Sequence, residues 1–106
     1  MVDTTPLQAA VDSLAERLRA LPQSALHRGA AATGLTLARE LARRAQRLES
    51  PEQPLRTLPE EGVFTVGDQV AVAGHDLVEA VRGAGPEGEG ALVEALELVR
   101  SAARSC

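Results

Sequence analysis

The stretch VFTVGDQVAVAGHDLVEAVRG, residues 63–83, decides between a helical and a mixed fold. Its start, with Val and Phe before a Gly-Asp pair, is typical of a β-hairpin. At helical spacing, however, positions 63, 66, 70, 73, 77, 80 and 84 are all Val, Ala or Leu, and this recurrence defines one apolar helix face. Strand-like alternation holds only for Val70 and Val72. The stretch therefore predicts a helix over 66–82, with a hairpin before residue 74 as the alternative.

The opposite face of this predicted helix is polar, and we expect it to be exposed. It carries Asp68, Gln69, His75, Asp76, Glu79 and Arg82. Thr65 and Asp68 have the spacing of a capping box, in which two side chains bond backbone N–H groups at a helix start. In this arrangement His75 points to solvent.

Two apolar seams precede this helix. The first follows a Thr-Thr-Pro start that suits a helix N-terminus, and it predicts a helix over 6–21 from Leu7, Val11, Leu14, Leu18 and Leu21. The second predicts a helix over 23–49, about 40 Å long if unbroken, from Ala30, Gly34, Leu37, Leu41, Ala45 and Leu48.

The stretch GAAATG, residues 29–34, is the weak point of the second predicted helix. Each Gly costs a helix up to about 1 kcal/mol relative to Ala. If the helix bends, we therefore expect the kink in this stretch. The compensation would be a close approach by a neighbouring backbone.

Residues 50–62 predict a loop, because Pro51, Pro54 and Pro59 each disfavour helix at the preceding residue. We expect Leu55 and Leu58 to pack this loop onto the bundle. The Pro51-to-Pro54 spacing matches a PxxP ligand, which is weak evidence in a Pro-rich connector.

The Gly-rich turn at 83–90 leads into a last predicted helix over 90–104. Its apolar residues cover more than half of its circumference, so it touches two neighbours or lies at an interface: Leu92, Val93, Ala95, Leu96, Leu98, Val99 and Ala102.

These elements predict an all-α fold, a small four-helix bundle with helices at about 6–21, 23–49, 66–82 and 90–104 and a Pro-rich loop at 50–62. The 106 residues are enough for a single helical domain, 1–106. With 44% hydrophobic residues the chain is too apolar to be disordered. Because it has one Phe and no Trp or Tyr, its core must consist of Leu, Val and Ala.

The composition argues against nucleic-acid and membrane partners. The net charge is −4 with no Lys and no Trp or Tyr, whereas nucleic-acid-binding domains are basic and often offer stacking residues. No apolar run approaches the roughly 20 residues of a membrane span, and the N-terminus does not read as a signal peptide. The single cysteine, Cys106, excludes an internal disulfide. We therefore expect a soluble, cytoplasmic protein.

Patterns for catalysis and metal binding are weak. His75 and Glu79 share a helix face, with Asp76 beside them, but no HExxH, paired CxxC or EF-hand pattern is present. His27 is interpreted in the same way, as a solvated residue. We expect no enzyme activity, no cofactor and no bound metal.

Two further features are interpreted as inert. The Gly-rich turn at 83–90 carries Glu87 and Glu89 and no Lys, so it would repel a phosphate. Cys106 is interpreted as a spectator thiol, because a terminal residue is poorly held for catalysis.

The most informative charge pattern is an arginine stripe on the second predicted helix. Arg39, Arg43 and Arg47 recur at intervals of four, with Arg44 adjoining. Residues 1–50 hold seven Arg against five acids, and residues 51–106 hold four Arg against ten acids. The stripe is interpreted as a solvated face, as a set of pairs with acids of the same bundle (Asp76, Glu79, Glu94 or Glu97), or as a site for an external acidic partner; Glu40 can pair with Arg44.

These features predict a non-enzymatic helical protein–protein interaction or regulatory module that self-associates as a homodimer. The long second helix, the apolar last helix and the small residues support this prediction, and the predicted partner-binding residues are Arg39, Arg43, Arg44 and Arg47. The alternative is a small-ligand-binding protein or an accessory subunit of a larger bacterial complex, with a cavity left between helices by Ala and Gly.

Overall fold

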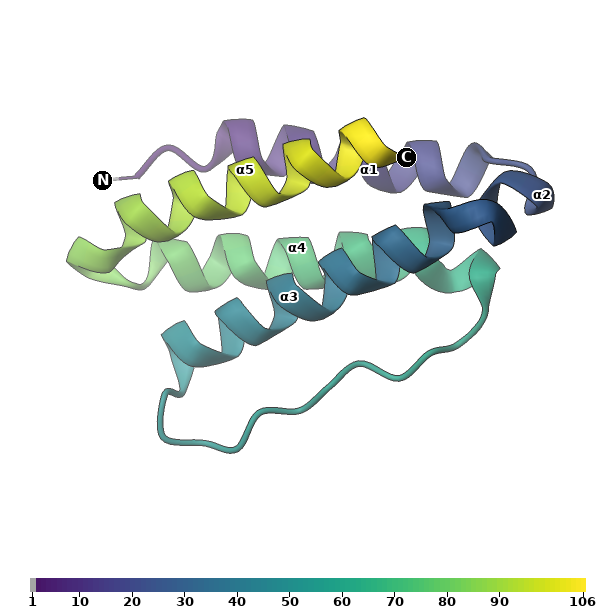
Figure 1. Ribbon diagram of the computed structural model, residues 1–106. Helices are drawn as coiled ribbons and strands as arrows, with labels where there is room; N and C mark the ends of the chain where they lie inside the picture. Colours follow the sequence, from purple (N-terminus) through teal and green to yellow (C-terminus); the bar gives the residue numbers. More distant parts are fainter. Residues whose placement is uncertain (1) are drawn as a thin grey trace.

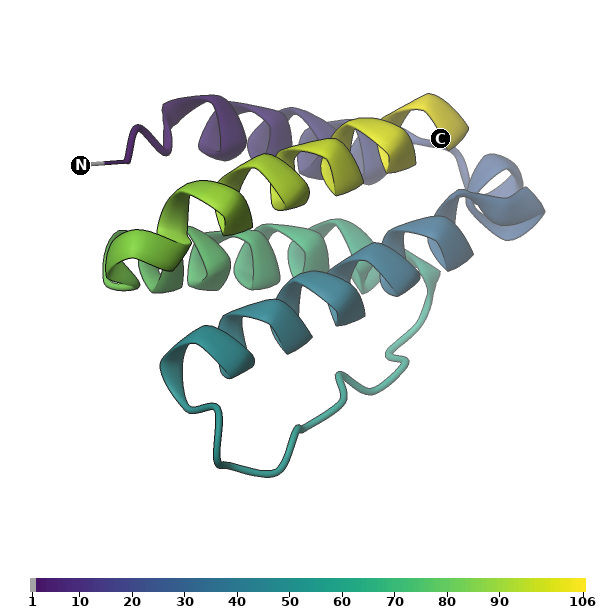
Figure 2. The ribbon, with the colours of Figure 1, turned by 60° about the vertical axis from the view of Figure 1, so that its left-hand side comes forward.

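The computed structural model describes residues 2–106, and this part of the chain is an all-α bundle without a strand. Four long helices make the bundle: α1 (Thr5–Ala20), α3 (Ala31–Glu49), α4 (Val66–Arg82) and α5 (Gly88–Ser105). In Figure 1, α3 and α5 lie in front of α1 and α4, and Figure 2 shows the same arrangement from the side. The predicted four-helix bundle is confirmed, and residues 66–82 form a helix rather than a hairpin.

Helix α4 is the central element and packs against α1, α3 and α5. Ten of its 17 residues are buried, including all five predicted seam positions within the helix: Val66, Val70, Ala73, Leu77 and Ala80. Helix α5 buries fewer residues and leaves Val93 62% exposed. The helix with the widest buried surface is therefore α4, and α5 keeps an uncovered side.

Glycines let α4 approach α1 closely. A Cβ atom at Gly74 would lie 2.4 Å from Cγ1 of Val11, and one at Gly67 would lie 2.9 Å from the carbonyl oxygen of Ala15. Both distances are well below van der Waals contact, so neither position has room for a side chain. At Gly34 the close neighbours are side chains rather than the expected backbone, since its Cβ would lie 2.5 Å from Cγ1 of Val66.

The second predicted helix, 23–49, is not a continuous rod, and its break lies within the predicted weak point, residues 29–34. Gly29 has φ 150° and ψ −21°, a conformation that glycine adopts at little cost, and it interrupts the helix. A short helix α2 (Gln23–Ala25) precedes the break, which lies within a π-helical turn (Leu26–Ala30). The break bends the chain so that Leu26 enters the core, 2% exposed. The 19 residues of α3 then span about 28 Å.

The predicted capping box is also wrong. Thr65 already has helical dihedral angles, φ −95° and ψ −9°, whereas a capping residue is usually extended. Its Oγ1 donates to the carbonyl of Gly62 at 2.8 Å instead. A 3-10 turn (Val63–Thr65) leads into α4, and Asp68 pairs with Arg19 on α1 at 2.8 Å.

Residues 50–62, called the strap below, cross the open side of α3 without forming a helix or strand (Figure 1). Polar side chains hold the strap through its backbone. Gln46 Nε2 donates to the carbonyl of Arg56 at 2.9 Å, and its Oε1 accepts from the N–H of Arg56 at 2.8 Å. Leu58 is half-buried as expected, but Leu55 is 43% exposed. The predicted loop is therefore confirmed, and hydrogen bonds rather than Leu55 fix its path.

Between residues 2 and 106 no helix combines the length and apolarity that crossing a membrane requires.

Candidate interaction surface

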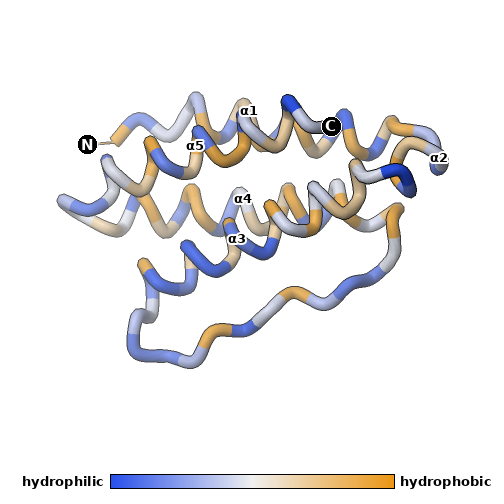
Figure 3. The backbone as a smooth tube through the Cα atoms, in the orientation of Figure 1, coloured by the Kyte–Doolittle hydropathy of each residue, from blue (hydrophilic) through white to orange (hydrophobic). Residues whose placement is uncertain are grey.

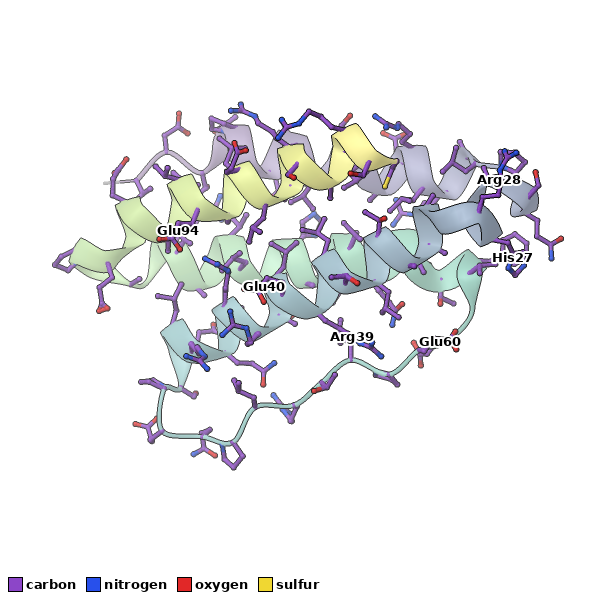
Figure 4. All side chains as sticks on the ribbon, in the orientation of Figure 1. His27, Arg28, Arg39, Glu40, Glu60 and Glu94 are labelled. Atoms are coloured by element: carbon purple, nitrogen blue, oxygen red, sulfur yellow. The ribbon has the colours of Figure 1, made fainter. Side chains whose placement is uncertain are left out.

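The four predicted partner-binding arginines lie on α3, whose C-terminal half is largely hydrophilic (Figure 3). Each has different surroundings. Arg39 points to the strap (Figure 4), where its Nε donates to the carbonyl of Leu58 at 2.9 Å. Arg43 and Arg44 bind acidic side chains of the same chain. Arg47 is exposed and forms no ion pair with any residue from 2 to 106. Their role toward a partner stays a prediction.

Glu40 is the centre of an ion-pair network that links α3 to α5. It accepts hydrogen bonds from Nε of Arg43 at 3.0 Å and from Nε of Arg44 at 2.8 Å. Arg44 also donates to Glu94 on α5 at 2.6 Å, and Glu40 and Glu94 lie on the facing sides of the two helices (Figure 4). The expected Glu40–Arg44 pair and an internal partner for the stripe, Glu94, are thus both present.

The two guanidinium groups lower the pKa of Glu40 from 4.5 to about 2, chiefly through the hydrogen bond from Arg43 and then that from Arg44. The hydrogen bond that Arg44 donates to Glu94 raises the pKa of Arg44 in turn. Glu40, Arg43 and Arg44 are therefore all charged at neutral pH.

We expect the contribution of Glu40 to stability to disappear as the pH falls from 4.5 to about 2. Because its pKa is lower in the folded state, the contribution is complete above the usual pKa and is lost on protonation. Glu40→Gln should lower the free energy of unfolding by about 1–2 kcal/mol at pH 7 and by almost nothing near pH 2. Urea unfolding followed by circular dichroism at several pH values measures this difference.

The control for this prediction is Glu52→Gln on the exposed strap, which should change stability by less than about 0.5 kcal/mol at any pH. A deficit of Glu40→Gln that stays constant from pH 7 to pH 2 would contradict the proposed ion-pair origin.

A groove of about 740 Å³ lies over α3, between α5 and the strap. Its floor and walls combine small side chains with charged ones, and we call it the front groove. It is lined by Ala32, Thr33, Thr36, Leu37, Arg39, Glu40 and Arg43 of α3, Leu98, Ser101, Ala102 and Ser105 of α5, and Leu55, Arg56 and Thr57 of the strap. With three arginines and one glutamate, its lining is basic.

A second hollow continues along α5 from the front groove, since Leu98 and Ser101 line both. This hollow is also lined by Arg44, Val93, Glu94 and Glu97. With two acids and one arginine its lining is acidic on balance, opposite in sign to that of the front groove. We call the two hollows together the front face. It presents an exposed valine, a half-buried leucine and charges of both signs.

His75 is exposed, as predicted, but it is not free. Its Nε2 lies 2.9 Å from Oδ1 of Asp12 on α1, and both side chains are 51% exposed. The hydrogen bond to His75 lowers the pKa of Asp12. Glu79 pairs with Arg82 instead of joining His75, and residues 2–106 contain no group of three His, Cys, Asp or Glu side chains that could hold a metal ion.

The remaining candidate residues do not come together with other reactive side chains. His27 is exposed, with Nε2 of Gln23 at 3.3 Å from its ring. Cys106 is half-buried, and burial raises the pKa of its thiol, which disfavours the reactive thiolate. Glu87, in the turn before α5, and Glu89, in the first turn of α5, are both exposed.

The sequence reasoning missed the front groove, because its wall on one side is the strap. The usable signal was the uncovered apolar surface of the last helix, which the pattern of Val93 and Leu98 did indicate. In the comparisons with known proteins, no family model, no curated protein and no solved structure matches this chain.

Proposed function

We propose that this chain is a non-enzymatic protein–protein interaction module that forms a homodimer through its front face. The observation that carries the proposal is the uncovered side of α5, where Val93 is 62% exposed beside a groove that continues along the helix. Exposed apolar side chains next to a groove with a polar rim are typical of protein-binding surfaces.

The charge order of α5 supports a second copy as the partner. At helical spacing, Val93, Glu97, Arg100 and Arg104 share the exposed side of α5. The acids of α5 thus precede its arginines along the chain. When two such helices pack antiparallel about a two-fold axis between Glu97 and Arg100, the glutamate of one copy faces the arginine of the other. A two-fold interface requires this kind of self-complementary surface.

The basic lining of the front groove extends the same pattern. Arg39, Arg43 and Arg56 line the groove, next to the place where the acidic half of the partner's α5 would lie. In this arrangement Arg39 and Arg43 contribute to the interface, whereas Arg44 holds α5 in place through Glu94. Opposite charges across an interface set its register and favour the correct partner.

Sedimentation velocity across the micromolar range tests the proposal. We expect a species of twice the 11.1 kDa chain mass that dissociates on dilution. Val93→Glu should give a monomer, because it places an additional acid among Glu94 and Glu97 without disturbing the core.

Val72→Glu on α4 is the matched control, since Val72 is 61% exposed and lines neither hollow of the front face. It should remain a dimer. A wild-type chain that is monomeric throughout the micromolar range, or a Val93→Glu variant that dimerises as well as Val72→Glu, would overturn the proposal.

The front groove gives less support to a small-ligand site. Its volume lies within the range of about 300–1,000 Å³ that is usual for ligand pockets, but such pockets enclose the ligand among apolar and aromatic side chains. The front groove is an open trough lined mainly by Thr, Ser, Ala and Arg.

A further inference from the structure

A separate groove lies on the other side of the strap, between the strap and α4. It holds about 380 Å³ and we call it the α4–strap groove. Its apolar wall consists of Ala42, Leu58, Pro59, Val72 and Ala73. Val72 is 61% exposed, so the groove presents an apolar surface to solvent at its centre.

The charged residues that line this groove are all acidic: Glu61, Asp68 and Asp76. Asp68 accepts from Arg19 at 2.8 Å. Glu61 and Asp76 form no ion pair or hydrogen bond through their carboxylates with residues 2–106. A carboxylate accepts several hydrogen bonds, so the groove offers acceptors at its rim even where Arg19 is bound.

Gln69 supplies an independent sign that the groove has unused acceptors. Its Nε2 donates to the carbonyl of Pro59 at 2.9 Å, which fixes the orientation of the amide. Its Oε1 is buried and accepts no hydrogen bond from residues 2–106. Buried acceptors of this kind are normally satisfied, so Gln69, which lines the groove, has an unmet hydrogen-bond acceptor there.

The spacing of the acids along α4 defines the size of a ligand. Asp68, Val72 and Asp76 follow each other at intervals of four residues and therefore share one helix face. The eight-residue separation places the two carboxylates about 12 Å apart along the helix axis, with Val72 midway. In an extended peptide, residues i and i+4 point to the same side and are about 13 Å apart, with residue i+2 between them.

From this match we propose that the α4–strap groove binds an extended basic peptide segment of another protein, with the pattern basic–x–apolar–x–basic. The two cationic side chains pair with Asp68 and Asp76, and their aliphatic stems lie on the apolar wall. The central apolar residue covers Val72. Arginine suits both ends, because its planar guanidinium group binds carboxylates in two-pronged geometry and its stem packs on apolar surface.

A linear polyamine shares the two cationic ends but has no side chain to cover Val72. A peptide is the better occupant because the acids flank an exposed valine rather than a polar floor. This inference does not depend on self-association, since Val72 and Asp76 lie outside both hollows of the front face.

The test uses the pentapeptide acetyl-Arg-Ala-Leu-Ala-Arg-amide, titrated into the full chain and followed by two-dimensional NMR of the backbone amides. We expect saturable shifts confined to the end of the strap, to α4 as far as about Asp76, and to α3 around Ala42, which are the segments that line the groove. The isomer acetyl-Arg-Arg-Ala-Leu-Ala-amide has the same composition and charge but the wrong spacing, and it should bind at least about fivefold more weakly.

Matched protein variants complete the experiment. Asp76→Asn should weaken binding by about fivefold, as expected for one partly exposed ion pair, and Glu87→Gln, which removes the same charge elsewhere, should leave binding unchanged. Val93→Glu should also bind the peptide normally, so that a loss of dimerisation can be distinguished from a loss of peptide binding.

Equal binding of the two peptide isomers, or equal effects of Asp76→Asn and Glu87→Gln, would overturn the proposal in favour of unspecific charge attraction. Displacement of the peptide by spermine at equal concentration would overturn it in favour of a polyamine site. Absence of saturable shifts would overturn it outright.

Discussion

Replacing Leu77 by alanine is expected to lower the free energy of unfolding by about 2–5 kcal/mol. Leu77 is 1% exposed and lies on the central helix α4, which contacts all three other long helices. Truncation therefore removes buried methyl groups and leaves a cavity that none of the neighbours can fill by moving alone. In a domain of this size each kcal/mol corresponds to about 4–8 °C in Tm.

Urea unfolding followed by far-ultraviolet circular dichroism measures the effect of Leu77→Ala, since the chain has no Trp or Tyr for fluorescence. Val72→Ala is the control on the same helix. Because Val72 is 61% exposed, its truncation should change stability by less than about 0.5 kcal/mol. Similar losses for the two variants would mean that α4 is not the buried centre of the fold.

Gly74→Ala is expected to destabilise the protein by about 1–3 kcal/mol, although alanine is the better helix former. The new methyl group would lie 2.4 Å and 2.8 Å from the two Cγ atoms of Val11. Val11 is fully buried on α1, and a β-branched side chain has few alternative rotamers in a helix. The helices α1 and α4 must therefore move apart, which loosens the contact on which both depend.

Gly90→Ala in α5 is the matched control, because a Cβ there meets no atom within 4 Å. This variant should be more stable than the wild type by about 0.4–1 kcal/mol. Combining Gly74→Ala with Val11→Ala should cost less than the sum of the two single changes, since the second removes the clash. Additive losses, or a Gly74→Ala variant as stable as Gly90→Ala, would contradict close packing at this site.

The fold was predictable where the apolar period was long and unbroken. From Val66 to Ala80 every position expected on the buried face of a helix is apolar, and the structure buries all of these residues. The break at Gly29 was not predictable in position, because the sequence shows two glycines in residues 29–34 and only the packing decides between them. Gly34 remains helical against Val66, and Gly29 takes the break.

The candidate site was predictable only as a set of residue types. The arginines of α3 were visible at their spacing of four, and so was the internal pair of Glu40 and Arg44. Their division of roles was not visible, because Arg44 meets Glu94 fifty positions away along the chain and Arg39 meets a backbone carbonyl. Backbone acceptors leave no mark on the sequence, so the loop at 50–62 was predictable, but its path across the bundle and the two grooves beside it were not.

The strap is suited to redesign, because side chains of the helices hold its backbone by hydrogen bonds. Gln46 holds the backbone N–H and carbonyl of Arg56, and Arg39 and Gln69 hold the carbonyls of Leu58 and Pro59. These hydrogen bonds are made to main-chain atoms, so they do not depend on the side chains at most strap positions. Residues 52–57 can therefore be diversified in a library while the bundle stays intact, and each new sequence would alter the border of the front groove without touching the core.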